Sequence, residues 1–127
     1  MADKQIVRTD RAPAPFQGAP YNQAVKAAGL VFTAGQVGLT PDGMAGEGVA
    51  EQTEQVMQNL RAILEEAGSG LDKLVKTTVF LQSLDDFAAM NEVYATHVGD
   101  SPPARSTVEV AKLPSGALVE IEAIALL

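Results

Sequence analysis

The chain has 127 residues, 46% of them hydrophobic and 5% aromatic, and a formal net charge of −7. This length predicts one domain over residues 1–127 with a single core, and the acidic balance disfavours a nucleic-acid surface, which needs clustered Lys and Arg. The chain has no cysteine, which excludes disulfides and thiol nucleophiles, and no signal peptide or membrane-spanning apolar run, which predicts a cytoplasmic protein without membrane contact.

The first third of the chain predicts short strands. We place them at residues 5–8, 22–27 and 30–39, with the last two joined as a hairpin by a turn at Ala28-Gly29. The prolines of Ala12–Pro15 keep the intervening segment extended. Gly35 lies inside the second hairpin strand. A glycine there marks either the close approach of a ligand or backbone, or a β-bulge.

The clearest helix in the sequence spans Val49–Ala67. Its apolar residues recur at helical spacing on one face, and Gly68 is the expected C-terminal stop. The strand that follows, Leu74–Gln82, is predicted to place Val75, Thr77, Val79 and Leu81 on one side. Phe80 lies on the other side, so both faces contain apolar groups.

A second helix follows that strand. Ser83-Leu84-Asp85-Asp86 has the spacing of a capping box, with Asp86 in place of the usual Glu or Gln. The buried stripe predicted for the helix is Phe87, Met90, Tyr94 and Val98. His97, the only histidine, has no neighbours at metal-ligand spacing and no adjacent nucleophile. We therefore predict a surface histidine and no metal site.

Two strand-like segments end the chain, at residues 102–111 and 118–126. Arg105 follows two prolines, which stiffen the backbone that presents it. Glu120 lies inside the last strand, on the same face as Ile124 and Leu126. A carboxylate among such neighbours is held in a structural ion pair or belongs to a functional site, and the residues alone leave both readings open.

Several groups of residues together suggest a family. They are Pro20-Tyr21-Asn22-Gln23, Thr33-Ala34-Gly35-Gln36, residues 75–81, residues 87–91, Pro103-Ala104-Arg105-Ser106 and Glu120-Ile121-Glu122-Ala123-Ile124. In this order and spacing the chain resembles, over nearly its whole length, the RidA (YjgF) family of reactive imine and enamine deaminases. The resemblance implies an α+β fold with a chorismate-mutase-like mixed sheet and two helices packed on one face.

The place of the last strand distinguishes two topologies. A hairpin of the last two strands would put Glu120 far from Arg105. The family order instead inserts the last strand antiparallel between the 30–39 and 74–82 strands, with the Arg105 strand outside the latter. We adopt this order, because a split crossover leaves a gap that a final strand can fill. Two helices cover only one sheet face, which predicts self-association, and the resemblance implies a homotrimer with pockets between subunits.

Arg105 and Glu120 suit the hydrolysis of a 2-imino acid, the activity that the resemblance implies. A guanidinium grips a carboxylate through two parallel hydrogen bonds and so fixes the neighbouring C=N carbon. A carboxylate opposite orients water, takes its proton and returns it to the departing nitrogen. The expected substrates are 2-aminoacrylate/2-iminopropanoate and 2-iminobutanoate, the products are 2-keto acids and ammonia, and no cofactor is needed.

By resemblance, Tyr21, the Gly35 backbone, Asn91 and Thr107 bind the substrate. Thr107 stands where many members have cysteine, and Ala34 where many have serine, departures that bear on substrate preference. The alternative function is a regulatory member that binds keto acids or other small carboxylates without turnover. RNA cleavage is a third, which the acidic charge disfavours.

The site is predicted to be shared between chains. In the family order, one strand separates those that carry Arg105 and Glu120, roughly 9–10 Å apart across the sheet. One small imino acid would strain to touch both. Arg105 lies on an edge strand, where a neighbouring subunit can dock. We assign Arg105, Thr107 and Asn91 to one subunit, and Tyr21, Gly35 and Glu120 to the next.

Overall fold

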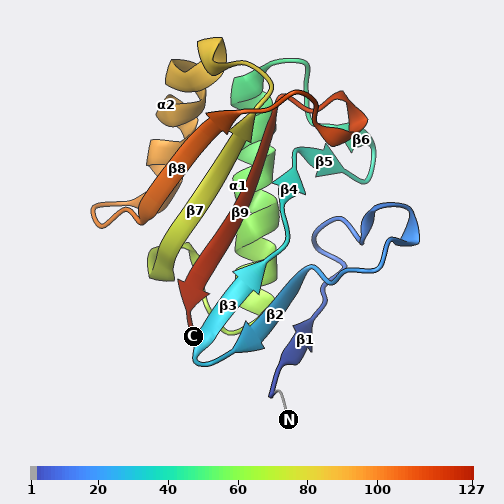
Figure 1. The fold of residues 1–127 in the computed structure, drawn as a ribbon, viewed down its shortest axis with the longest axis vertical. Coiled ribbons are helices and arrows are strands. Elements are labelled where there is room, and N and C mark those ends of the chain that lie inside the picture. Colours follow the sequence, from blue (N-terminus) through green and yellow to red (C-terminus); the bar gives the residue numbers. More distant parts are fainter. Residues whose placement is uncertain (1–2) are drawn as a thin grey trace.

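A seven-stranded mixed sheet forms the centre of the computed structural model, which describes residues 3–127 (Figure 1). The strands are β1 (Gln5–Val7), β2 (Ala24–Ala27), β3 (Leu30–Thr33), β4 (Gln36–Val37), β7 (Leu74–Leu81), β8 (Ala104–Glu109) and β9 (Val119–Leu126). They follow the order β1-β2-β3-β9-β7-β8, and β4 extends the β3 side of β9. A small separate hairpin consists of β5 (Leu39–Thr40) and β6 (Gly43–Met44).

The last strand of the chain lies inside the sheet. β9 is antiparallel to both β3 and β7, and β8 pairs with β7 in parallel at the edge of the sheet (Figure 1). This is the strand order that the family resemblance implies, so the alternative hairpin of the last two strands is wrong. The first hairpin is confirmed, because Ala28 and Gly29 both have positive φ, as a two-residue turn requires.

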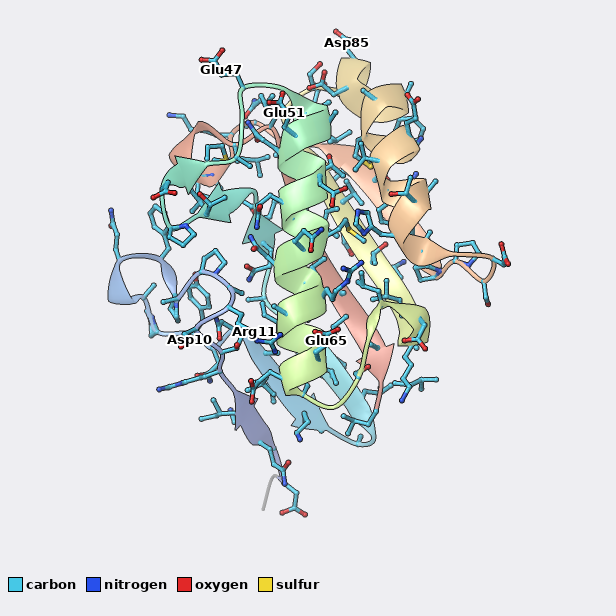
Figure 2. The ribbon with its side chains drawn as sticks, turned by 180° about the vertical axis from the view of Figure 1, so that it is seen from behind. Asp10, Arg11, Glu47, Glu51, Glu65 and Asp85 are labelled. Atoms are coloured by element: carbon cyan, nitrogen blue, oxygen red, sulfur yellow. The ribbon has the colours of Figure 1, made fainter. Side chains whose placement is uncertain are left out.

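Both helices, α1 (Val49–Glu66) and α2 (Phe87–Val98), cover the same face of the sheet, seen from that side in Figure 2. Every residue of the predicted apolar face of α1 is buried, namely Val49, Thr53, Val56, Leu60, Ile63, Leu64 and Ala67. The helix ends at a glycine with positive φ, Gly68, whose N–H donates to Glu65, while that of Ser69 donates to Leu64. The expected α+β fold is therefore confirmed.

The opposite face of the sheet carries neither helix (Figure 1). β9 points Ile121, Ala123 and Ala125 into the core beneath the helices. Its other side chains lie on the open face, where Leu126 is 52% exposed. Neighbouring β3 exposes Phe32 there, because Phe32 is the cross-strand partner of Ile124. Among residues 3–127, neither helix has the length and apolar character that a membrane crossing requires.

Bulges make two strand predictions wrong. The expected strand over residues 30–39 is interrupted at Ala34-Gly35: Phe32 pairs with Ile124 and Gln36 with Ile121, so four residue steps oppose three. A register shift between Leu74 and Lys76 likewise changes the side of β7 on which the intervening side chain lies. Val75 is therefore 42% exposed and does not share the face of the buried Thr77, Val79 and Leu81, whereas Leu74 is buried.

The start of α2 also differs from the prediction. Met90, Tyr94 and Val98 are buried as expected, but Phe87 is 40% exposed in the first turn, where its ring lies beside Arg105. Ser83 caps this end by accepting a hydrogen bond from the N–H of Asp85. Asp86 returns no hydrogen bond among the described residues, and a short 3₁₀ turn precedes the helix, so only half of the capping box forms.

His97 is not a surface residue. Its side chain is 7% exposed, and its Nε2 lies 2.8 Å from Oε1 of Glu54 on α1. The side chain of Glu54 is 47% exposed. Side-by-side packing of the helices covers the histidine and leaves the glutamate at the rim, so this pair ties α2 to α1.

Candidate active site

The six predicted site residues form two clusters on opposite faces of the sheet. Arg105 is the cross-strand partner of Thr77, which is buried beneath the helices, whereas Glu120 is the partner of Phe80. Because side chains alternate between faces along β7, Thr77 and Phe80 point in opposite directions. Arg105 therefore faces α2 and Glu120 faces the open side. Within one chain these two side chains do not meet.

We call the first cluster the glutamate pocket. It is a hollow of about 370 Å³ that brings Tyr21, Gly35 and Glu120 together. Phe16 and Pro114 are among its other lining residues, so that apolar surface surrounds a single carboxylate. Tyr21 is held in place because its Oη accepts a hydrogen bond from the N–H of Phe16 at 2.7 Å.

Glu120 is the electrostatic centre of this pocket. Burial, and to a lesser degree the nearby charge of Glu122, raise the pKa of Glu120 above its ordinary value of 4.5. Within residues 3–127 its carboxylate makes no ion pair and no side-chain hydrogen bond. The alternative of a structural ion pair inside one chain is therefore wrong, and the carboxylate is available to other groups.

Gly35 is explained by its position against Glu120. A Cβ added to Gly35 would overlap Oε2 of that side chain and lie 2.9 Å from its Cδ. The β-bulge is confirmed, and the close approach at Gly35 is that of a side chain, not of a ligand or backbone. The bulge turns the backbone toward the pocket, and the missing side chain leaves room for the carboxylate.

We call the second cluster the arginine cluster, consisting of Asn91, Arg105 and Thr107. The guanidinium carbon of Arg105 lies 4.9 Å from the ring centre of Tyr94 and 5.5 Å from that of Phe87. Arg105 makes no ion pair with any residue of 3–127. A half-buried cation without an anionic partner is a suitable anchor for a carboxylate.

Two buried polar atoms in this cluster have no hydrogen-bond partner within the described residues. They are Oδ1 of Asn91 and Oγ1 of Thr107. Thr107 follows Arg105 by two residues on the same face of β8, and Asn91 lies one turn from Tyr94 on α2. Buried polar atoms in folded proteins are rarely left unpaired. Their concentration here points to a ligand or a neighbouring chain that completes the bonding.

The sequence prediction missed four residues around these clusters. Phe87 and Tyr94 were assigned only to a buried stripe, yet their rings flank Arg105. Their spacing from Asn91, four residues before it and three after, places all three on one helix face and was a usable signal. Phe16 and Pro114 reach the glutamate pocket from loops, and their sequence carries no comparable signal.

A larger hollow, of about 920 Å³, also reaches Tyr21 and is lined by Arg8 and Arg11 among others. Arg11 is already engaged there, because it pairs with Glu65 at 3.4 Å, as Figure 2 shows beside the lower end of α1. No group of three His, Asp or Glu side chains in residues 3–127 could hold a metal ion. The two clusters therefore remain the candidates for chemistry.

Known proteins resemble this chain along its whole length. Residues 9–127 match the family model described as Endoribonuclease L-PSP. A RutC family protein of Synechocystis is 51% identical over 97% of this chain and 96% of its own. The 2-iminobutanoate/2-iminopropanoate deaminase of Mus musculus is 43% identical over 96% and 90%. The crystal structure of E. coli TdcF with bound serine superposes with a TM-score of 0.89 at 39% identity, over 97% of this chain and 98% of that one.

Proposed function

Because the chain belongs to the L-PSP family, which includes the RidA and RutC proteins and reactive intermediate deaminases, we propose that it hydrolyses reactive 2-imino and 2-enamino acids. The proposed substrates are 2-aminoacrylate/2-iminopropanoate and 2-iminobutanoate, and the products are 2-keto acids and ammonia. The observation that carries the proposal is the pair of complementary clusters, an arginine without an anion and a carboxylate without a cation.

Arg105 is the proposed anchor. Its guanidinium has no anionic partner in the described chain, so its parallel N–H donors can take both oxygens of the substrate carboxylate. The carboxylate is attached to the imine carbon, and gripping one fixes the other in space. The unpaired atoms of Asn91 and Thr107 beside it offer further contacts to the same ligand.

Glu120 is the proposed general base and acid. Its raised pKa reflects a carboxylate that has lost part of its hydration, and such a group binds a proton more strongly than one in water. Glu120 takes a proton from a water molecule as its oxygen attacks the imine carbon, and passes this proton to the nitrogen, which receives the electron pair of the C=N bond, so that a carbinolamine forms. Glu120 then transfers the hydroxyl proton of the carbinolamine to the nitrogen. The C–N bond breaks, ammonia leaves and the C=O bond of the keto acid forms.

A single chain does not bring these two parts together, so we propose a homotrimer with three shared sites. One subunit contributes Arg105, Thr107 and Asn91, and the next contributes Tyr21, Gly35 and Glu120. Two features support this arrangement. β8 lies at the edge of the sheet and the open sheet face exposes apolar side chains such as Leu126 and Phe32, which association would cover.

The same pocket suits a second function, binding small carboxylates without turnover. E. coli TdcF holds serine in its crystal structure, which shows that a relative takes an amino acid of this size. RNA cleavage, to which the name of the family model refers, has less support, because the chain carries a net charge of −7 and phosphate contacts require clustered cations.

An assay with the imine made in situ separates these functions. An amino-acid oxidase or a threonine dehydratase generates the imine, and the release of ammonia and keto acid is followed with and without the protein. We expect a rate above that of unaided hydrolysis, and a return to the unaided rate in Arg105→Ala. Binding of 2-oxobutanoate without any acceleration would instead establish the regulatory alternative.

A further inference from the structure

Aromatic rings, rather than a carboxylate, hold Arg105 in place. Its guanidinium lies over Tyr94 at 4.9 Å and over Phe87 at 5.5 Å, distances within the range of cation–π attraction. Both rings come from α2, three and four residues from Asn91. An acidic partner would also orient the guanidinium, but it would occupy the N–H donors and cancel the charge. Aromatic faces orient the cation and leave its donors free.

Tyr94 is itself fixed by the sheet. Its Oη and Oγ1 of Thr77 lie 2.6 Å apart, and the two residues are 5% and 0% exposed. Thr77 is also the cross-strand partner of Arg105 in β7. This hydrogen bond therefore ties the ring of Tyr94, which lies beside the guanidinium, to the residue of β7 that pairs with Arg105. Burial raises the pKa of Tyr94 above 10.0, so the hydroxyl keeps its proton and the bond persists at neutral pH.

We propose that Tyr94, held by Thr77, and Phe87 are positioning residues that set the plane of the Arg105 guanidinium for two-pronged binding of the substrate carboxylate. This inference rests on the proposed role of Arg105 as the anchor. The buried ring of Tyr94 lies on the interior side of the guanidinium, and the exposed ring of Phe87 lies on its solvent side. Neither ring takes part in the chemical step. Their effect is on how tightly a carboxylate binds.

Three substitutions separate the parts of this device. Tyr94→Leu removes the ring, Tyr94→Phe keeps the ring and removes its bond to Thr77, and Phe87→Leu removes the exposed ring. Phe87→Leu also guards against a folding defect, because its side chain is already 40% exposed. Val31→Ala is the control: it alters a buried side chain of β3, which β9 separates from β7 and from the aromatic rings.

The affinity for 2-oxobutanoate, measured by calorimetry, is the first readout. We expect it to weaken about 3- to 30-fold in Tyr94→Leu, which is the range of one cation–π contact, and less in Phe87→Leu and Tyr94→Phe. In the imine assay KM should rise more than kcat falls, since the rings support ground-state and transition-state binding alike. Val31→Ala should lower the melting temperature, because it leaves a cavity in the core, and should leave the affinity unchanged. Unchanged affinity in both Tyr94→Leu and Phe87→Leu would overturn the proposal.

The proton resonances of the Arg105 side chain provide a readout that needs no ligand. Ring currents should shift its δ and ε protons upfield in the native protein, and Tyr94→Leu should reverse most of this shift. If the native protein neither binds 2-oxobutanoate nor accelerates imine hydrolysis, the proposed function fails, while these shifts still test the stacking. Arg105 resonances that do not respond to removal of either ring would overturn the positioning role whatever the activity.

Discussion

Arg105 and Glu120 lie on opposite faces of one sheet, on two strands that both pair with β7. Arg105 is the partner of Thr77, and Glu120 is the partner of Phe80 three residues further along that strand. An odd separation along a strand reverses the direction of the side chains. If both residues act on one substrate, they must come from different chains.

Complementation between inactive variants tests this consequence. Arg105→Lys should lose carboxylate binding as well as rate, because an ammonium cannot reproduce the two-pronged grip. Glu120→Gln should keep binding and lose turnover, because an amide does not transfer the proton. After subunits exchange in an equal mixture, the mixture as a whole should recover up to about a quarter of the native rate, since one neighbouring pair in four supplies both native residues. Native mass spectrometry confirms the exchange, and mixed trimers without activity would place the site within one chain.

Light scattering tests the assembly itself. We expect about three chain masses at micromolar concentration, because association covers the apolar open face of the sheet. Leu126 and Phe32 belong to that face, so Leu126→Glu should shift the protein toward the monomer and reduce activity in parallel. A stable native monomer would contradict both the trimer and the shared site.

Substitution of Gly35 should act through Glu120. The Cβ of Gly35→Ala would overlap the carboxylate, so Glu120 must move and turnover should fall by about tenfold or more, as expected for a misplaced catalytic group. In a double-mutant cycle, Gly35→Ala added to Glu120→Gln should cost little further activity, because the displaced group is already disabled. Independent, additive losses would show that Gly35 matters for another reason, such as the geometry of the bulge.

The raised pKa of Glu120 predicts how activity and stability depend on pH. As a base, Glu120 acts when ionised, so kcat/KM should rise through a pKa above 4.5, and this limb should vanish in Glu120→Gln. The contribution of Glu120 to folding stability changes with pH in the opposite direction. The favourable contribution of protonated Glu120 is complete below pH 4.5 and is lost as the pH rises through the folded-state pKa. In urea unfolding, the free energy of unfolding of Glu120→Gln should therefore rise relative to that of the native protein as the pH increases over that window.

Thr107→Val separates binding from stability. Oγ1 of Thr107 is buried without a partner in the described residues, and valine has nearly the same shape. The ligand-free protein should be stabilised by up to about 1 kcal/mol, because an unsatisfied hydroxyl is removed. Affinity for 2-oxobutanoate should fall only several-fold, since Arg105 supplies the charge-assisted contact. A loss as complete as in Arg105→Lys would contradict the assignment of Arg105 as the main anchor.

The pair of His97 and Glu54 predicts a pH-dependent contribution to stability. Its hydrogen bond from His97, with a second from Gln58, lowers the pKa of Glu54 below 4.5. Its contribution is present above pH 4.5 and is lost as the pH falls through the lowered pKa. Because Glu54 is 47% exposed, Glu54→Gln should cost under about 1 kcal/mol at pH 7. Glu92 is exposed and supplies the control, Glu92→Gln. Equal losses of stability in the two variants would show that the pair of His97 and Glu54 stabilises the fold no more than an ordinary surface charge does.

Local signals were sufficient to predict much of the secondary structure. The boundaries of α1 were correct to one residue, because apolar spacing and the terminal Gly68 report on the helix itself. The hairpin at Ala28-Gly29 was also local, since its turn depends on two adjacent residues. The order of the strands was different. The residues alone allowed a terminal hairpin, and only the family resemblance placed β9 between β3 and β7.

Amino-acid sequence by itself identified the family and named Arg105 and Glu120 as candidate site residues. The tertiary structure alone decided that they lie on opposite sheet faces, that Gly35 makes room for the carboxylate, and that the rings of Tyr94 and Phe87 lie beside the guanidinium. It also buried His97 against Glu54. The physical reason is the same in each case. Bulges, strand neighbours and helix contacts depend on residues that are distant in sequence, and a single residue added to one strand reverses the faces of all that follow.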